Sequence, residues 1–202
     1  MDRLDAFVAL LRAEAGRQNL VSASTLGEGL WVRHIADSAQ LLPLVHDGAA
    51  DDATLAAGGN WADLGSGPGL PGLVIALLAP QWTVHLVESR KLRCTFLRDA
   101  ISALAIPNAV VHEKRVEALA TAVPFDVISA RAFAPLEKLL SISSHLASES
   151  TIWLLPKGQN AVNELSTLPA AWQSLFHVEP SRTDGDARIL ICQALRPSVS
   201  GQ

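Results

Sequence analysis

The chain has 202 residues, of which 49% are hydrophobic, and its formal net charge is −4. The length suits one domain with at most a small addition, and the lack of any apolar run of about 18 residues argues against a membrane-spanning helix. Proteins that coat nucleic acid are usually basic, because phosphate neutralisation supplies most of their affinity. The acidic charge therefore disfavours that class unless basic residues gather locally.

Two helices are predicted before residue 46. Apolar residues repeat at the helical spacing i, i+3, i+4 and i+7 over residues 1–16, and again over residues 28–45, where Trp31, Ile35, Ala39 and Leu42 share one face. Residues 46–60 are rich in Ala, Gly and Asp, a composition typical of a loop. We therefore expect an N-terminal helical cap over residues 1–58.

Beyond residue 60, short apolar runs alternate with helical stretches, which predicts βαβ units around a parallel sheet. The predicted strands cover residues 61–64, 83–87, 109–112, 126–129, 151–155, 175–178 and 189–194. The predicted helices cover residues 70–78, 91–104, 116–120, 135–147 and 161–165. The last two strands are joined by Thr183-Asp184-Gly185-Asp186, which predicts a hairpin and so an antiparallel edge strand. The expected core, residues 59–196, is a Rossmann-like α/β domain with a mostly parallel seven-stranded sheet, followed by a flexible tail over residues 197–202.

The segment Gly65-Ser66-Gly67-Pro68-Gly69 lies between the first strand of this core and the next helix. Glycines let the backbone turn sharply and approach a ligand, and the free N–H groups of the helix can meet a nucleotide or a carboxylate. The dinucleotide fingerprint has its third glycine at the sixth position, where this chain has Leu70, so the spacing is GxGxG. That spacing, with Asp63 two residues before the first glycine, is typical of S-adenosylmethionine-dependent methyltransferases.

Glu88 ends the second predicted strand of the core. An acid at this position can accept hydrogen bonds from both ribose hydroxyls, in NAD as well as in S-adenosylmethionine. Glu88 therefore predicts a nucleoside ligand without choosing between the two. The alternative is that it caps the helix that follows Ser89.

A resemblance to a known family rests mainly on two segments, Arg33-His34-Ile35-Ala36-Asp37-Ser38 and the longer run over residues 63–72. Shorter segments between residues 19 and 194 also match. In these the chain resembles the bacterial RsmG (GidB) family, which methylates N7 of a guanine in small-subunit ribosomal RNA. The resemblance implies a Rossmann-like methyltransferase fold, S-adenosyl-L-methionine as the cofactor and 16S ribosomal RNA as the substrate.

The resemblance also implies a set of cofactor-binding residues, which Glu88 joins on the ribose argument: Gly65, Leu70, Val116, Glu117 and Arg131. Glu117 follows the third strand, where such folds usually meet the adenine. Arg131 follows the fourth strand and is expected to hold the cofactor carboxylate or an RNA phosphate, with a surface ion pair as the alternative. Contacts to RNA phosphates are expected from Arg33, His34 and Lys157, with a structural role as the alternative for the histidine.

Guanine N7 carries a free lone pair at neutral pH, so methyl transfer to it needs no general base, and orientation supplies the catalysis. A carboxylate near the base can stabilise the positive charge that develops there. Asp63 is the candidate, with fixing the loop as its other role. Cys94 and Cys192 lack the Pro-Cys context of a cytosine-methylating nucleophile and are expected to be packed thiols. An ordinary histidine pKa near 6.5 predicts that RNA contact by His34 weakens as the pH rises.

Three alternatives remain open: an NAD-dependent oxidoreductase, which Leu70 disfavours, a non-catalytic RNA-binding or ribosome-assembly protein with a relic cofactor site, and a small-molecule methyltransferase. The expected partner is small-subunit ribosomal RNA or a 30S assembly particle, bound by a monomer without membrane or metal. The two widely separated cysteines and the charged N-terminus, which lacks a signal-peptide pattern, predict a cytoplasmic location.

Overall fold

A computed structural model describes residues 3–22, 26–27, 29–48 and 58–193. The predicted flexible tail, residues 197–202, and most of the predicted loop between the cap and the core lie outside the described residues. No helix in the described ranges is long and apolar enough to cross a membrane.

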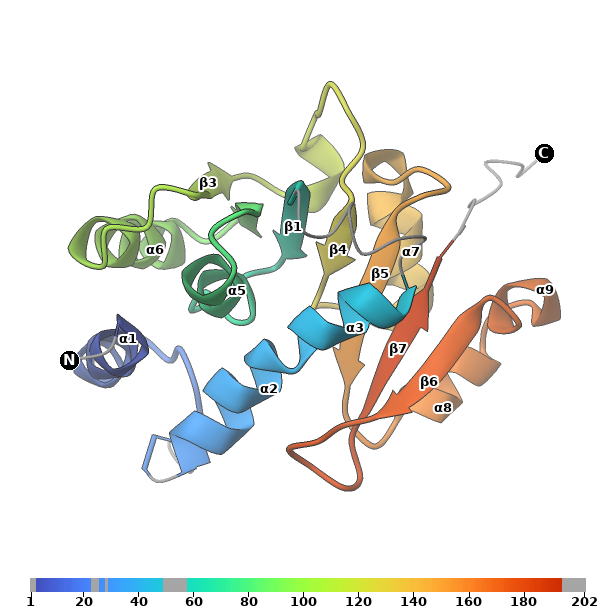
Figure 1. The fold of residues 1–202 in the computed structure, drawn as a ribbon, viewed down its shortest axis with the longest axis horizontal. Helices are drawn as coiled ribbons and strands as arrows, with labels where there is room; N and C mark the ends of the chain where they lie inside the picture. Colours follow the sequence, from blue (N-terminus) through green and yellow to red (C-terminus); the bar gives the residue numbers. More distant parts are fainter. Residues whose placement is uncertain (1–2, 23–25, 28, 49–57, 194–202) are drawn as a thin grey trace.

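A seven-stranded sheet with the order β3-β2-β1-β4-β5-β7-β6 forms the centre of the molecule (Figure 1). Its strands are β1 (Asn60–Leu64), β2 (Thr83–Glu88), β3 (Ala109–Glu113), β4 (Val127–Ser129), β5 (Ile152–Lys157), β6 (Phe176–Pro180) and β7 (Arg188–Cys192). Strands β1 to β5 pair in parallel, and β7 is antiparallel to both β5 and β6. The predicted mostly parallel sheet with an antiparallel hairpin at one edge is therefore confirmed.

Within that hairpin the antiparallel strand β7 is the inner one, and β6, at the edge, has the direction of β5. The burial of the two strands explains their order. Four consecutive residues of β7, from Ile189 to Cys192, are buried, as a strand covered on both faces requires, whereas only Phe176 of β6 is.

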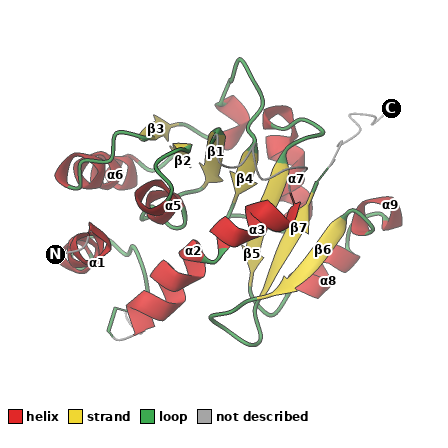
Figure 2. Ribbon diagram, viewed as in Figure 1, coloured by secondary structure: helices red, strands yellow, loops and turns green. Residues whose placement is uncertain are grey.

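Helices cover both faces of the sheet (Figure 2). One face is covered by α1 (Arg3–Glu14), α3 (Leu41–Gly48), α5 (Gly72–Leu78) and α6 (Lys91–Ala103). The other is covered by the 3₁₀ turns Val116–Ala118 and Ser144–Leu146, α7 (Leu136–Ser143) and α8 (Ala161–Ser166), with the short α9 (Ala170–Gln173) before β6. Successive side chains of a strand point to opposite faces of the sheet, so one strand contributes to the hydrophobic core on both faces. Trp61 of β1 belongs to the first hydrophobic cluster, and Ala62 and Leu64 belong to the second.

Where one helix was predicted over residues 28–45, the structure has three consecutive helical segments: a π-helical stretch (Trp31–Ala36), α2 (Asp37–Ala39) and α3. The bend at Gln40 is bonded to the β6–β7 hairpin. Gln40 donates to Asp37 Oδ1 at 2.7 Å and accepts from the Arg182 N–H at 2.8 Å, while the Thr183 hydroxyl donates to Asp37 Oδ1 at 2.8 Å. The N-terminal helices are thereby fixed to the far edge of the sheet, and Asp37 is held beside the carboxyl ends of β4 and β5.

Candidate active site

The glycine loop turns back against the end of β2. The N–H groups of Gly65 and Ser66 both donate to the Val87 carbonyl, at 2.8 and 3.1 Å. Gly65 has a φ of +69°, a conformation that glycine adopts without strain. A Cβ at Gly65 would collide with the ring of Phe133, so the backbone of the loop directly contacts a side chain from the segment after β4.

Asp63 is fully buried beneath this loop and links three elements. Its Oδ2 accepts from the Gly72 N–H of α5 at 3.0 Å, and its Oδ1 accepts from the Ser129 hydroxyl of β4 at 3.1 Å. The Ser129 oxygen in turn accepts from Trp61 Nε1 at 2.9 Å. Burial raises the pKa of the Asp63 carboxyl from 3.8 to about 6, against the lowering effect of these hydrogen bonds. The contacts correspond to the loop-fixing role anticipated for Asp63.

Glu88 accepts three backbone hydrogen bonds at the end of β2. Its Oε1 accepts from Ser89 and Arg90, at 2.8 and 2.9 Å, and its Oε2 accepts from the Gly67 N–H at 3.1 Å. Glu88 therefore does make the helix-start contacts anticipated as its alternative role, and it also holds the glycine loop. Arg93 also lies beside this carboxylate, with its Nη1 3.6 Å from Oε2. A carboxylate has about four acceptor positions, so the three backbone bonds leave roughly one, which a ribose hydroxyl would share with the neighbouring Arg93.

A cavity of about 210 Å³ opens between the glycine loop and the segment after β3. Four of the six predicted cofactor residues line it: Gly65, Glu88, Val116 and Glu117. Leu70 is not among the lining residues; its side chain is buried in the first hydrophobic cluster. The volume is below the roughly 300–1,000 Å³ of most ligand pockets, and Phe133 lies at its border.

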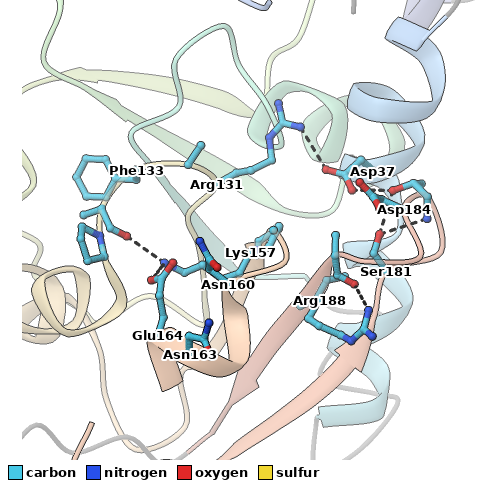
Figure 3. Close-up of a pocket in the computed structure, with 18 of the residues that line it drawn as sticks. Asp37, Arg131, Phe133, Lys157, Asn160, Asn163, Glu164, Ser181, Asp184 and Arg188 are labelled. Carbon is cyan, nitrogen blue, oxygen red and sulfur yellow. Dashed lines mark hydrogen bonds and ion pairs between the residues drawn. The ribbon is translucent and has the colours of Figure 1, made fainter. Parts of the chain in front are cut away.

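A second cavity, of about 830 Å³, adjoins the first and lies at the carboxyl ends of β4 and β5 (Figure 3). The segment after β4, the start of α8, the β6–β7 hairpin and the N-terminal helices all contribute to its wall. Arg33, Arg131 and Lys157 line it, so the structure brings together residues expected to contact RNA with an arginine expected at the cofactor.

Arg131 belongs to this larger cavity and does not line the smaller one. Its guanidinium lies 3.2 Å from Asp37 Oδ2, donates to the Arg33 carbonyl at 3.1 Å and contacts His34 Nδ1 at 3.2 Å. The ion pair anticipated as the alternative role of Arg131 is thus present. It is formed with the N-terminal helices rather than in open solvent, since both side chains are less than one-fifth exposed.

Lys157, at the end of β5, is also held by neighbours. Its ammonium donates to Glu164 Oε2 at 2.7 Å and to the Ala134 carbonyl at 3.0 Å, and the lysine side chain is only 9% exposed. The same Glu164 oxygen accepts from the Leu136 N–H at 2.8 Å, at the start of α7. This ion pair joins β5, α7 and α8 at the floor of the larger cavity.

His34 differs from the behaviour expected of an ordinary histidine. Burial, and then the neighbouring Arg131, lower the pKa of His34 from 6.5 to about 4. The imidazole is therefore neutral throughout the physiological range, and the expectation that it changes charge near neutrality is wrong. A neutral ring can accept the hydrogen bond from Arg131, which suits the observed contact.

Cys94 and Cys192 are buried thiols, as predicted, and burial raises the pKa of both, that of Cys192 to about 12. Neither lines either of the two cavities. The described part of the chain contains no group of three or more His, Cys, Asp or Glu side chains arranged to hold a metal ion.

Three residues of the site were not assigned a role from the sequence. Asp37 lies inside the Arg33–Ser38 segment that carried the family resemblance, Phe133 lies two residues after Arg131, and Glu164 lies in the α8 sequence. Asp37 could have been suspected as the partner of an arginine. Nothing in the sequence pairs Phe133 with Gly65 or Glu164 with Lys157, because these contacts depend on how the loops fold.

Comparison with known protein families gives one match that spans most of the chain. The profile of the GidB family, described as rRNA small subunit methyltransferase G, matches residues 1–187. Similar proteins carry the name ribosomal RNA small subunit methyltransferase G. The protein of Sphingopyxis alaskensis is 51% identical over 94% of this chain and 76% of its own length. That of Rhizorhabdus wittichii is 45% identical over 100% of this chain and 89% of its own length.

Solved structures share the fold at low sequence identity. The E81Q mutant of MtNAS in complex with S-adenosylmethionine superposes with a TM-score of 0.60 and 15% identity, covering 96% of this chain and 75% of that one. A ribosomal protein L11 methylase from Lactobacillus delbrueckii subsp. bulgaricus gives a TM-score of 0.56 and 15% identity, covering 79% of each chain. Both are similar in fold, which is the Rossmann-like fold expected from the sequence.

Proposed function

This chain belongs to the rRNA small subunit methyltransferase G (GidB) family, and from that premise we propose that it transfers a methyl group from S-adenosylmethionine to N7 of a guanine in 16S ribosomal RNA. The observation that carries the proposal is the pair of adjoining cavities. Gly65 and Glu88 line the smaller one, and the charged residues that line the larger one are Arg33, Arg131, Lys157 and Arg188 beside Asp37, Glu164 and Asp184. A cofactor site beside a larger site with positive side chains is what methyl transfer to RNA requires.

Several residues fit an adenosine cofactor in the smaller cavity. Glu88 offers its remaining acceptor capacity to a ribose hydroxyl, Val116 offers an apolar wall to the adenine, and Gly65 lines the cavity with the ring of Phe133 packed against it. Leu70 shapes the loop from the core, and Glu117 lies after β3 at the adenine end. When bound, S-adenosylmethionine supplies an electrophilic methyl group on a sulfonium sulfur.

Asp63 contributes by holding the loop and α5 in place. It lines neither cavity, so its charge would act on the positive charge that develops on the base only from beneath the loop. No side chain is required to remove a proton, because N7 already presents its lone pair. The protein therefore contributes to catalysis by binding the two reactants and aligning them.

RNA phosphates are the proposed ligands of the larger cavity. Arg33 is an exposed lining residue, while Arg131 and Lys157 are partly buried and paired. His34 does not line the cavity and reaches it only through its contact with Arg131. Arg33 can therefore contact a phosphate directly. Arg131 and Lys157 add positive charge and fix the shape of the wall. We assign the substrate to free small-subunit RNA or a 30S particle, acted on by a monomer in the cytoplasm.

The proposal is tested by methyl transfer from labelled S-adenosylmethionine to purified 16S RNA, to 30S particles and to small-molecule acceptors in parallel. Label is expected in RNA, in 7-methylguanosine on nuclease digestion. Label confined to small molecules, or cofactor binding without transfer to any acceptor, would overturn it.

Two variants that each remove one positive charge distinguish a direct contact between this cavity and RNA from an effect of the protein's net charge. Arg33→Gln removes a charge from the lining of the larger cavity and should raise the KM for RNA. Arg98→Gln removes a half-exposed charge on α6, away from both cavities, where it pairs with Glu113 at 2.8 Å. Equal effects of the two changes would show that net charge, and not this cavity, controls RNA binding.

A further inference from the structure

The residues that line the two cavities indicate where the cofactor methyl group and the target guanine would meet. Methyl transfer requires N7, the methyl carbon and the sulfur to lie in line, with the reacting atoms about 3–3.5 Å apart. If the cofactor occupies the smaller cavity and the base the larger, the transfer takes place at their shared border. Of the described residues that line them, only Phe133 and Ala134 line both.

Phe133 is the only aromatic residue among the described residues that line either cavity. Its ring packs against Gly65 on one side, and the side chain is 36% exposed, so part of it remains open to the cavity (Figure 3). The preceding residue, Ala132, has a φ of +49°, which is uncommon for a residue other than glycine. The backbone therefore turns sharply between Arg131 and Phe133, and in Figure 3 the Arg131 side chain extends away from Phe133 toward Asp37.

We infer that Phe133 stacks on the target guanine and holds it at the border of the two cavities, an assignment that rests on the proposed function. A guanine taken out of its RNA stack loses its neighbouring bases, and enzymes that act on such bases replace them with an aromatic or apolar side chain. Phe133 is the side chain at the border that offers an aromatic face. Ala134, the other shared residue, has none.

Stacking also favours the reaction itself. As N7 takes the methyl group, the guanine becomes positively charged, and a cation over an aromatic face is attracted to the ring. The interaction of Phe133 with the base is therefore stronger in the transition state than before transfer. Loss of the ring should lower kcat as well as raise the KM for RNA.

The test compares Phe133→Leu, which keeps an apolar side chain without a ring, with Phe133→Trp, which keeps an aromatic face. Base stacking measured by truncation predicts a loss in kcat/KM of about 5- to 150-fold for Phe133→Leu. Phe133→Trp should stay close to the wild type. Leu175→Ala serves as the control, since Leu175 is 40% exposed and lines neither cavity.

Two binding measurements keep the stacking role separate from the proposed function. Calorimetry with S-adenosylmethionine should show a change in Kd for Phe133→Leu that is much smaller than the loss in kcat/KM, because leucine keeps an apolar side chain beside Gly65. With S-adenosylhomocysteine bound, 7-methylguanosine 5′-monophosphate should bind the wild type more tightly than guanosine 5′-monophosphate, because the methylated base is cationic. Phe133→Leu should lose this preference.

Each outcome decides one of the two claims. A wild type that transfers no methyl to ribosomal RNA overturns the proposed function, and the nucleotide titrations then decide the stacking role by themselves. Unchanged kcat/KM in Phe133→Leu, equal losses in the Leu and Trp variants, or a loss matched by weaker S-adenosylmethionine binding would each overturn the role of Phe133.

Discussion

The Asp63 carboxylate accepts the Gly72 N–H at 3.0 Å and so fixes the start of α5 against β1. A side chain at Gly72 would collide with Asp63 and Leu86, so the helix approaches the strands this closely only with glycine there. The carboxylate is thereby enclosed without exposure to water, which is the cause of its raised pKa.

The Asp63 carboxyl makes the stability of the protein depend on pH. Its folded-state pKa is about 6 against an ordinary value of 3.8, so the folded state favours the protonated form. Its contribution is fully present below pH 3.8 and is lost as the pH rises through about 6. A shift of this size corresponds to about 2–3 kcal/mol in the free energy of unfolding.

Asp63→Asn removes this titration. The difference in unfolding free energy between the variant and the wild type should therefore grow in favour of the variant from about pH 4 to about pH 6 and then level off, as measured by urea denaturation. Asp63→Ala is the comparison. It also lacks the titrating group but leaves the Gly72 N–H without its acceptor, so it should be less stable than Asp63→Asn by about 1–3 kcal/mol at every pH. A constant difference between Asp63→Asn and the wild type would contradict the raised pKa.

Cofactor affinity should depend on one ribose hydroxyl more than on the other, since three backbone groups and the neighbouring Arg93 already use most of the acceptor capacity of Glu88. Deoxy analogues of the cofactor at each of the two positions are expected to lose affinity unequally. A lost hydrogen bond to a charged group costs about 1.5–3 kcal/mol, so the more sensitive position should lose about 10- to 150-fold in Kd.

The variant Glu88→Gln should erase most of that difference. Its single amide oxygen can accept either from Ser89 and Arg90 or from Gly67, because the amide nitrogen accepts no hydrogen bond, so a weaker hold on the loop is expected as well. Glu113→Gln is its matched control, because Glu113 is the register partner of Glu88 on β3 and lies outside the smaller cavity. Calorimetric titration of both variants with both analogues provides the measurement. If the two variants behave alike, Glu88 acts on the loop and not on the ribose.

A side chain at Gly65 should affect stability as well as ligand binding. Its φ of +69° strains other residues, by roughly 1–2 kcal/mol, and the added Cβ would strike Phe133. Gly65→Ala is therefore expected to lower the unfolding free energy and to weaken cofactor binding together. Gly185→Ala, where a Cβ meets nothing within 4 Å, should change neither. A fully stable Gly65→Ala protein would indicate that the loop relaxes around the new side chain.

The pH dependence of methyl transfer should be nearly flat from about pH 6.5 to 9. A free N7 lone pair needs no base, and His34, with a pKa of about 4, keeps its neutral form over this range. Single-turnover rates at saturating RNA test this directly, with His34→Gln as the variant that should give the same profile. A rate that climbs tenfold per pH unit through neutrality would mean that a proton is removed, and that N7 is not the acceptor.

The strands were predicted closely because their signals are local. The apolar runs before Gly65 and Glu88 are short and bounded by loop residues, and β1 and β2 begin and end within one residue of the prediction. The order of the last two strands was not accessible in this way. The inner position of β7 follows from its burial on both faces, which only the packed sheet reveals.

The sequence allowed residues to be proposed for the site, but not the contacts that they make with one another. Gly65 and Glu88 were proposed because the loop spacing is typical of nucleoside-binding sites. The pairing of Arg131 with Asp37 depends on the N-terminal helices crossing to the end of β4, about 94 residues away in sequence. No periodicity in the sequence encodes such a contact.

The bonds between Gln40, Asp37 and the hairpin join residues that are 142 and 146 positions apart. During synthesis the helix that carries Gln40 leaves the ribosome early, and Arg182 and Thr183 leave near the end. Asp37, Thr183 and Arg131 all line the larger cavity, so its wall closes only when almost the whole chain has emerged. A nascent chain could form the glycine loop and β1 to β4 well before this, and would acquire its larger cavity as one of the last events of folding.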